Sequence, residues 1–552
     1  MKKSIFLILF TVSAALLWAM PPMPGSGLKH DGSQRMTNSS PVYSKSSASA
    51  DKVSKAKAVA TTGTKKILAI LVYFPSYTRK GTTYNELSFK SGHGVSYYED
   101  LLGDYTDDNP SSLTMAEYYK KMSRGNLNLQ FQVLGPYEAK NDYVYYGEND
   151  ILGNDYADPL KELVNEALDF ASGSVDSDID NCSVILIHAG PGEENGGVSS
   201  DYIWSHRSTI PKKTINTTSG TVTYTDYIIV PEYTIYGGTT EATIGVFCHE
   251  FGHILGLMES YDGSSATAGV GQWSLMAGGS WGSMGKAGVA YGADPAPFMA
   301  WELVWLGWLS EENITPASGE TITRTFGNID DEDTVYRIDL TDNQYLTLEG
   351  KKKNMTGCGM VVPETGLLIT QIHTGILDSY WSSNTINYGS SRVHGSMIVE
   401  AVATNYKSKG LGDLWRGSAN VYRFTTTALF RSDTLTSVSP SDSSSSADIP
   451  FLPLFISTIT GSGIVISMML VWYYGRRRLC LAIACASVAV CLCFSCDMGG
   501  GSSSGGTYDT GPNTNYYTNM YNVHSKTGIS GITIYNIQVN EDGSGSFSVK
   551  KD

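Results

Sequence analysis

Residues 249–259 read His-Glu-Phe-Gly-His-Ile-Leu-Gly-Leu-Met-Glu and contain the motif His-Glu-x-x-His. Two histidines four residues apart lie on one face of a helix, where their imidazole nitrogens can bind one zinc ion. The spacing therefore predicts His249 and His253 as metal ligands. Glu250 follows the first ligand directly and is placed to take a proton from a zinc-bound water rather than to bind the metal.

The residues after the motif predict a third ligand and an apolar floor for the metal. Gly256 allows a sharp turn where a helix would otherwise continue, so that Glu259 can return toward the two histidines. Asp262 is the alternative third ligand. Farther along, residues 273–281 read Trp-Ser-Leu-Met-Ala-Gly-Gly-Ser-Trp and place Met276 where it can form the floor beneath the metal, a Met-turn.

Length and composition limit the class of protein. A chain of 552 residues exceeds the size of a single core and favours about three or four units. The net charge of −15, with no basic stripe to offset it, argues against a nucleic-acid partner. Charged residues make up only 17% of the chain and aromatic residues 11%, a mixture typical of an extracellular protein rich in loops and strands.

The N-terminus indicates export. Two lysines precede an apolar run that is too short to span a bilayer, which predicts a secretory signal over residues 1–19 with cleavage near Ala19. Residues 20–64 are poor in large apolar side chains and predict a largely disordered pro-segment. No cysteine precedes Cys182, so a cysteine thiolate cannot be the group that keeps the metal inactive.

Residues 65–310 predict a catalytic domain of the α/β type. The apolar run 67–74 ends at Pro75 and indicates a buried central strand. Further elements are expected at 112–121 (a helix capped by Ser111 or Ser112), 127–134 (a strand), 158–171 (a helix) and 182–188 (a second buried strand). Helices packed on a twisted sheet follow from this order.

Two acidic clusters flank the second buried strand. They consist of Asp176, Asp178 and Asp180 before it and Glu193 and Glu194 after it. Oxygen-rich loops of this kind can hold calcium, so the clusters predict a structural calcium site, with a solvated turn as the alternative.

Several segments resemble the M6 peptidases, the immune inhibitor A-like secreted metalloproteases. Besides the zinc motif and the Met-turn, they are residues 67–75 (Ile-Leu-Ala-Ile-Leu-Val-Tyr-Phe-Pro), 188–194 (His-Ala-Gly-Pro-Gly-Glu-Glu), 203–207 (Ile-Trp-Ser-His-Arg) and 306–308 (Leu-Gly-Trp). The resemblance covers residues 65–430 and resumes at the C-terminus. It implies a metzincin-like zinc endopeptidase acting on extracellular proteins, with His249 and His253 as ligands and Glu250 as the catalytic base.

The chain departs from the family at the third ligand. The family usually reads Gly-Leu-Pro-Asp-x-Tyr-Asp after the second histidine, whereas residues 256–262 read Gly-Leu-Met-Glu-Ser-Tyr-Asp. Glu259 occupies the position of the usual aspartate, so the backbone must absorb one extra methylene. The spacing leaves open which group steadies the oxyanion, with Trp281, Tyr291 and His206 as candidates.

After residue 310 the pattern changes to short alternating strands. Residues 311–436 predict a β-rich, β-sandwich-like accessory domain with strands at 321–326, 334–340, 344–349, 366–372 and 396–402. A Ser-rich linker follows at 437–449. Residues 521–552 are expected to complete the β-domain, with 527–534 pairing with 421–426.

The insertion between these parts is strongly apolar. Within residues 450–496, the run 451–474 is long enough to span a bilayer and is followed by three arginines, and a second apolar run covers 479–495. The prediction is a membrane tether through residues 451–495, either a transmembrane hairpin or a lipoprotein-like anchor ending at Cys496. A Gly/Ser/Asn-rich linker, 497–520, follows it.

The sequence thus predicts an exported, membrane-tethered zinc metalloendopeptidase that hydrolyses peptide bonds in extracellular proteins. One alternative is a catalytically inactive surface adhesin that retains the protease fold. Another is an amidase or deformylase with the same zinc motif. The exported part carries three cysteines, Cys182, Cys248 and Cys358, which do not indicate a disulfide scaffold.

Overall fold

The computed structural model describes residues 18–19, 60–79, 81–103, 113–148, 157–195, 201–233, 243–262, 269–282, 290–353, 365–387, 394–398, 429–430 and 532–551. Residues 1–17 of the predicted signal, nearly all of the predicted pro-segment, both linkers and both apolar runs lie outside these ranges. Among the residues that are described, no helix combines the length and the apolar character needed to cross a membrane.

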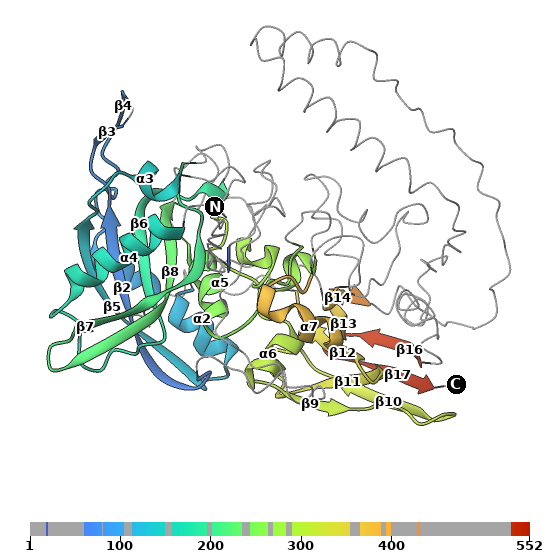
Figure 1. Ribbon diagram of the computed structural model, residues 1–552. Coiled ribbons are helices and arrows are strands. Elements are labelled where there is room, and N and C mark those ends of the chain that lie inside the picture. The colour runs from blue at the N-terminus through green and yellow to red at the C-terminus, as the bar shows by residue number, and fades with distance from the viewer. Residues whose placement is uncertain are drawn as a thin grey trace, which may run out of the picture. The chain divides into compact units, whose positions relative to one another are not determined.

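The N-terminal part is built on a six-stranded sheet of order β1-β7-β8-β6-β2-β5 (Figure 1). Its strands are β1 (Trp18–Ala19), β2 (Gly63–Tyr73), β5 (Leu127–Glu138), β6 (Val184–Pro191), β7 (His206–Asn216) and β8 (Thr221–Tyr233). Strand β2 is parallel to β5 and β6, and β6 is parallel to β8. Strand β7 is antiparallel to β8 and carries β1 on its outer edge.

Among the residues described in this part, five α-helices and a small hairpin accompany the sheet. They are α1 (Val95–Leu102), α2 (Met115–Met122), α3 (Tyr143–Gly147), α4 (Ala157–Ala171) and α5 (Ile244–Ile254), with β3 (Tyr77–Arg79) and β4 (Thr82–Tyr84). Figure 1 shows α4 in front of the sheet, with α2 and α5 gathered toward the C-terminal part. The mixed α/β architecture predicted from the sequence is confirmed.

Strand β2 supplies side chains to two apolar clusters, because successive residues of a strand point to opposite faces. Ile67 and Leu71 belong to the cluster that includes residues of α2 and α5, whereas Leu68 and Ile70 belong to the cluster of α4. All four side chains are fully buried. The apolar run at 67–74 therefore forms a strand covered on both faces, as predicted.

Helix α2 begins later than the sequence suggested, and its cap differs. Thr114, rather than Ser111 or Ser112, is the N-cap: its hydroxyl accepts from the Glu117 amide, and the Glu117 side chain accepts from the Thr114 amide. This reciprocal capping box satisfies two backbone donors that the first helical turn leaves open. The serines preceding the helix have no comparable carboxylate three residues on, which is why the cap lies at Thr114.

The C-terminal part contains two further sheets. One has the order β14-β13-β12-β11-β9, with β15 also paired to β13, and the other has the order β10-β17-β16. The strands are β9 (Ser310–Asn313), β10 (Thr321–Phe326), β11 (Thr334–Thr341), β12 (Gln344–Lys351), β13 (Gly366–His373), β14 (Ser396–Ile398), β15 (Leu429–Phe430), β16 (Ile532–Val539) and β17 (Gly545–Lys551). Two helices, α6 (Ala300–Leu306) and α7 (Thr374–Tyr380), adjoin the larger sheet's strands in sequence.

The two C-terminal sheets share one apolar core. Leu346 and Ile369 of the larger sheet and Ile534 and Phe547 of the smaller one belong to it, all fully buried. Strand β17 pairs with β10, more than two hundred residues earlier in the chain. The predicted partner of the last strands, residues 421–426, lies outside the described residues.

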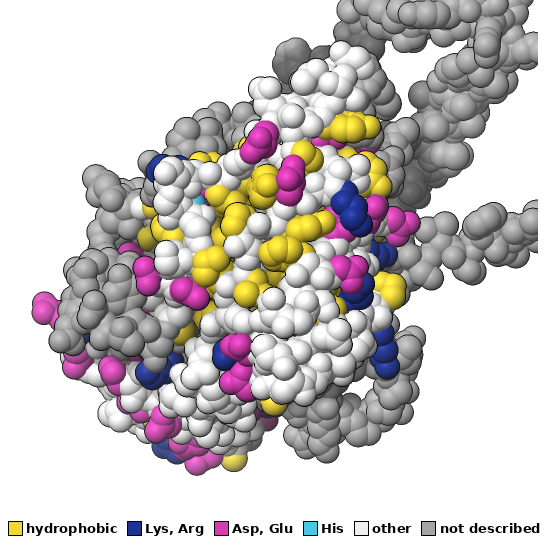
Figure 2. Space-filling model, turned by 90° about the vertical axis from the view of Figure 1, so that its left-hand side faces the viewer, with side chains coloured by type: hydrophobic (Ala, Val, Ile, Leu, Met, Phe, Trp, Pro, Cys, Tyr) yellow, Lys and Arg dark blue, Asp and Glu magenta, His cyan; other side chains and the backbone are white. Residues whose placement is uncertain are grey.

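Charged side chains of both signs are interspersed on the face drawn in Figure 2. Lysine and arginine are scattered singly among aspartate and glutamate there and do not form a stripe. Apolar side chains reach the surface between them in several places, which is ordinary for a folded protein.

His188 on β6 makes the stability of the fold depend on pH. Its ring is buried, Nδ1 lies 3.0 Å from the Ala189 carbonyl oxygen, and Nε2 has no partner among the described residues. Burial lowers the pKa of His188 to about 4. Because the unfolded chain then binds the proton more tightly, stability is present above a pH of about 6.5 and is lost as the pH falls toward 4.

We therefore expect His188→Gln to lose less stability on acidification than the wild type. Between pH 7 and pH 5, the difference in unfolding free energy should move by about 2 kcal/mol in favour of the variant. Urea unfolding of both proteins at the two pH values measures it. Parallel pH profiles would show that His188 does not titrate in this way.

Candidate metal centre

Helix α5 carries the two predicted histidine ligands, and the Nδ1 atom of each ring is hydrogen-bonded to a backbone carbonyl. His249 Nδ1 lies 2.8 Å from the Leu275 carbonyl oxygen, and His253 Nδ1 lies 2.9 Å from that of Leu257. Both rings are buried. Since a carbonyl oxygen only accepts, each Nδ1 donates, and we assign both rings the tautomer with Nδ1 protonated. Each neutral ring is left with a lone pair on Nε2.

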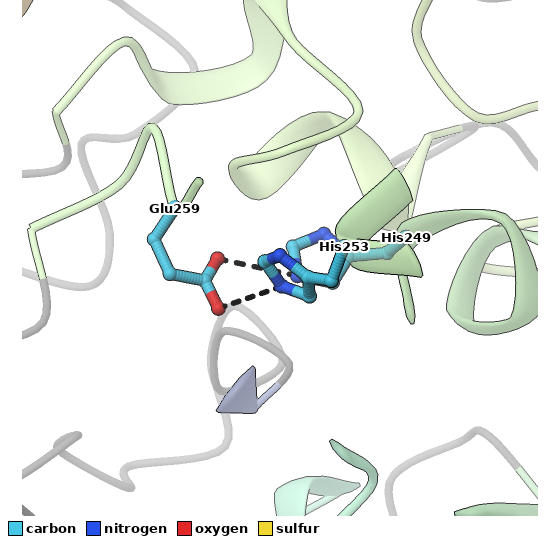
Figure 3. A group of neighbouring side chains, drawn as sticks. All are labelled: His249, His253 and Glu259. Atoms are coloured by element: carbon cyan, nitrogen blue, oxygen red, sulfur yellow. Dashed lines mark ion pairs between the residues drawn. The ribbon is translucent and has the colours of Figure 1, made fainter. Parts of the chain in front are cut away.

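These lone pairs face the carboxylate of Glu259 (Figure 3). His249 Nε2 lies 3.2 Å from Oε2, and His253 Nε2 lies 3.0 Å from Oε1. Acceptors that face one another in a buried site are stable together only with a cation between them. Within the described part of the chain, these three residues form the group whose potential ligand atoms all lie within 4.8 Å of one another.

The donor set fits zinc. Two imidazole nitrogens and one carboxylate oxygen are a common zinc set, and bonds of about 2.0–2.1 Å in a tetrahedron separate neighbouring ligand atoms by about 3.3–3.4 Å. Burial would by itself raise the pKa of Glu259, but positive charge on the facing rings, as when they are protonated, outweighs burial and lowers that pKa. Burial also lowers the pKa of His253. An ionised carboxylate and neutral imidazoles are the protonation states that bind a metal.

The turn at Gly256 brings Glu259 to the helix face. Helix α5 ends at Ile254, and Gly256 has a φ of +100°, where an L side chain is strained. An added Cβ at Gly256 would also lie 2.7 Å from the Trp305 ring. The sharp turn predicted at Gly256 is therefore confirmed. Both the backbone angle at this position and the packing around it require glycine.

Met276 lies directly against α5 between the two histidines. An added Cβ at Gly252 would lie 2.5 Å from Met276 Sδ, so only glycine lets the methionine pack this closely. The Met276 amide donates to Ser274 Oγ at 2.9 Å, and Leu275, between these two residues, provides the carbonyl that holds His249. The segment thus both underlies the helix and orients a histidine ring.

Glu250 is buried beside this group. Neither of its carboxylate oxygens has a hydrogen-bond partner among the described residues. Burial raises the pKa of Glu250 well above its usual range, and the charges of Glu259 and Glu194 raise it further, while Arg207 acts in the opposite direction. A carboxylate that holds a proton more readily than usual is suited to accept a proton and then return it.

The remaining catalytic candidates have other surroundings. Asp262 is buried but is not a member of the three-residue group, in which Glu259 supplies the carboxylate. Both ring nitrogens of His206 are engaged, one with the Trp204 carbonyl at 2.7 Å and one with the Tyr227 hydroxyl at 3.0 Å. Trp281 is fully buried in the apolar cluster around α5, and Tyr291 packs against that cluster.

The structure separates the two acidic clusters predicted for calcium, which lie at opposite ends of β6. Lysines neutralise the first cluster: Lys66 pairs with Asp176 at 2.6 Å and Asp178 at 3.1 Å, and Lys65 pairs with Asp180 at 3.0 Å. In the second, the buried Glu194 accepts from the Ser205 amide and hydroxyl, and Glu193 begins a short 3₁₀ turn. The clusters therefore do not form one oxygen-lined site.

Sequence reasoning missed three polar residues around the third ligand, namely Glu302, Asn384 and Asn387. Asn384 Oδ1 accepts from the Glu259 amide at 2.7 Å. Glu302 accepts from the hydroxyls of Ser260 and Ser274, at 2.7 and 2.8 Å. No local pattern could have indicated them, because they lie 42 to 127 residues from Glu259 and Ser260 in the chain.

Fold and site together define a metallopeptidase domain, and comparison with known proteins agrees. Residues 53–185 and 174–308 match the family model described as "Immune inhibitor A peptidase M6, catalytic domain". This region of the chain matches the M6 peptidase family of metalloproteases, as its sequence resemblance implied.

Two curated relatives are each similar to part of this chain. A pre-pro-metalloprotease PrtV of Vibrio cholerae serotype O1 is 30% identical over 295 residues, which cover 46% of this chain and 31% of the relative. An immune inhibitor A of Bacillus thuringiensis subsp. alesti is 29% identical over 281 residues, covering 42% of this chain and 38% of the relative. The chain therefore spans about a third of the length of the curated relatives it matches.

Proposed function

We propose that the chain is an exported zinc-dependent endopeptidase with a metzincin-like catalytic domain, in which His249, His253 and Glu259 hold the metal. The observation that carries the proposal is the geometry of these three residues. The Nδ1–H of each imidazole donates to a backbone carbonyl, so each Nε2 presents a lone pair to the ionised carboxylate of Glu259. A cation bound between these atoms stabilises the arrangement.

Glu250 supplies the acid–base chemistry in this proposal. A zinc ion held there would polarise a peptide carbonyl and lower the pKa of water. Glu250, next to His249 in the chain and without a hydrogen-bond partner among the described residues, accepts the proton of the attacking water. It then returns that proton to the leaving amine, for which its raised pKa suits it.

The proposed substrates are extracellular proteins, whose peptide bonds the enzyme would hydrolyse. This part of the proposal rests on the N-terminal signal predicted from the sequence and on the similarity to the peptidase family. Residues 311–436 and 521–552 are proposed to form an accessory β-domain that supports the catalytic domain. Tethering through residues 451–495 stays a prediction from the sequence, because these residues lie outside the described structure.

Zinc content and casein cleavage of the purified full chain, with and without a chelator, test the proposed function. We expect one zinc per chain and cleavage that the chelator stops and added zinc restores. Zinc without cleavage would favour the inactive adhesin instead, and a chain that takes up no zinc would overturn the proposed metal centre.

A further inference from the structure

The third ligand lies on a segment that belongs to no helix or strand. Glu259 and Ser260 follow the turn after α5 in irregular backbone. Two contacts come from residues that follow soon after in the chain. The Ser260 amide donates to the Met276 carbonyl at 2.7 Å, and the Ser260 carbonyl accepts from the Val270 amide at 3.0 Å. With no regular ladder of backbone hydrogen bonds, the position of Glu259 depends on such individual contacts.

The C-terminal part contacts the same two residues through a pair of asparagines. After α7, the short helix η5 (Trp381–Ser383) ends at Asn384, whose φ is +49°. Asparagine adopts this left-handed conformation more readily than most residues. The conformation directs Asn384 Oδ1 at the Glu259 amide, 2.7 Å away, which places a hydrogen bond on the backbone of the ligand residue itself.

Asn387 holds the adjacent carbonyl. Its side chain is 1% exposed, and Nδ2 donates to the Ser260 carbonyl at 2.8 Å and to Ser396 Oγ at 3.1 Å. Asn387 Oδ1 accepts from the Ser396 amide at 3.1 Å. The β14 residue Ser396 thus fixes the orientation of the amide, and a buried amide with these bonds satisfied has one favoured position.

Apolar contacts support the same junction. Met258 precedes the ligand and Tyr261 follows Ser260, and both are buried in a cluster with Leu377 of α7 and Ile386 between the two asparagines. The segment that carries Glu259 is therefore anchored before, within and after the ligand residue by residues 374–387 and 394–398 of the C-terminal part.

We infer that Asn384 and Asn387 are positioning residues of the metal centre and that residues 374–387 and 394–398 support full metal affinity. This inference rests on the proposed metal site. The two asparagines lie outside residues 53–308, which match the catalytic domain of the family. They act on the ligand through its backbone: without them the Glu259 carboxylate would be free to move away from the imidazoles, and residues that orient a ligand typically contribute about 10- to 100-fold to metal affinity.

The experiment compares metal binding by the full chain and three variants. Asn384→Gly removes the acceptor but keeps the backbone conformation, and Asn384→Asp restores an acceptor at the same place. Asn536→Gly is the matched control, because Asn536 is an exposed asparagine with a similar φ of +52° on β16. Zinc affinity is measured by competition with a chromogenic chelator, and the visible absorption of the cobalt(II) form reports the coordination geometry.

We expect Asn384→Gly to bind zinc about 10- to 100-fold more weakly than the wild type and to change the cobalt spectrum. Asn384→Asp should recover most of the affinity, and Asn536→Gly should bind like the wild type. Asn384→Gly leaves the Glu259 amide without its acceptor and should unfold below Asn536→Gly in excess chelator, so zinc affinity is measured on folded protein to separate the metal effect from this loss of stability.

Tight zinc binding and an unchanged cobalt spectrum in Asn384→Gly, with a wild type that binds zinc, would overturn the positioning role alone. Asn384→Gly could also unfold at a lower temperature than Asn536→Gly in excess chelator and yet bind zinc with wild-type affinity when folded. That result would show that Asn384 supports the fold and not the metal centre. A wild type that binds no metal would overturn the proposed site together with this inference.

Discussion

Glu250→Gln should stop peptide hydrolysis while leaving the metal and the fold in place. Glutamine keeps the shape of the side chain but cannot take a proton from water, and removing a positioned acid–base group typically slows a reaction about 10²- to 10⁴-fold. Zinc content should be unchanged, because Glu250 is not among the three residues whose ligand atoms converge. Casein cleavage and zinc analysis of the two full-length proteins measure both expectations.

The stability of this variant is also informative. Glu250 is fully buried, its oxygens lack hydrogen-bond partners among the described residues, and burial raises its pKa. A neutral amide avoids the free energy of burying the charge, so the unfolding temperature of Glu250→Gln should equal or exceed that of the wild type. Higher stability together with lost activity is the pattern expected of a catalytic group.

Glu99→Gln provides the control for the activity measurement, since Glu99 is an exposed residue of α1 and the substitution makes the same chemical change away from the metal centre. This variant should retain wild-type cleavage. Cleavage by Glu250→Gln at more than a tenth of the wild-type rate would remove Glu250 from its proposed role and would require a different proton acceptor.

Local spacing explains why the sequence could indicate that His249, His253 and Glu259 come together, as they do in the structure. Histidines four residues apart share a helix face in any helix, and a glycine shortly after the motif limits where the chain can turn. The same applies to the strands: β10 covers residues 321–326 as predicted, and β11, β12 and β13 each begin at the predicted residue. Period-two alternation and bounding turns are properties of the strand itself.

The sequence could not reveal what depends on distant partners. The hairpin of β7 and β8 was not predicted, because β7 is mostly polar in sequence and forms a strand through its pairing with β8. The asparagines that hold Glu259 and Ser260 lie at least 125 residues away. The lysine partners of Asp176, Asp178 and Asp180 also come from another strand, β2, so these ion pairs could not be read from the acidic loop itself.

Removing the metal should destabilise the fold as well as stop catalysis. The three ligand residues bring together α5, the turn after it and, through Asn384, the C-terminal part of the chain. A ligand that binds only the folded state at about 1,000 times its dissociation constant contributes about 4 kcal/mol to stability. For domains of this size each kcal/mol changes the unfolding temperature by about 2–4 °C, so chelation should lower it by about 8–16 °C.

His253→Ala tests whether this stabilisation arises at the proposed site. Without its second imidazole the site should not retain zinc through dialysis, and the unfolding temperature of the variant should no longer respond to chelator. His188→Ala is the control: it removes a buried histidine of β6 that is outside the three-residue group, so its loss should lower stability but leave the response to chelator intact. A His253→Ala protein that keeps one zinc and the full chelator response would mean that the metal is bound elsewhere. We expect the opposite because the variant keeps only one imidazole and one carboxylate of the three ligands that converge there, and zinc sites in proteins normally hold the ion with three or four protein ligands.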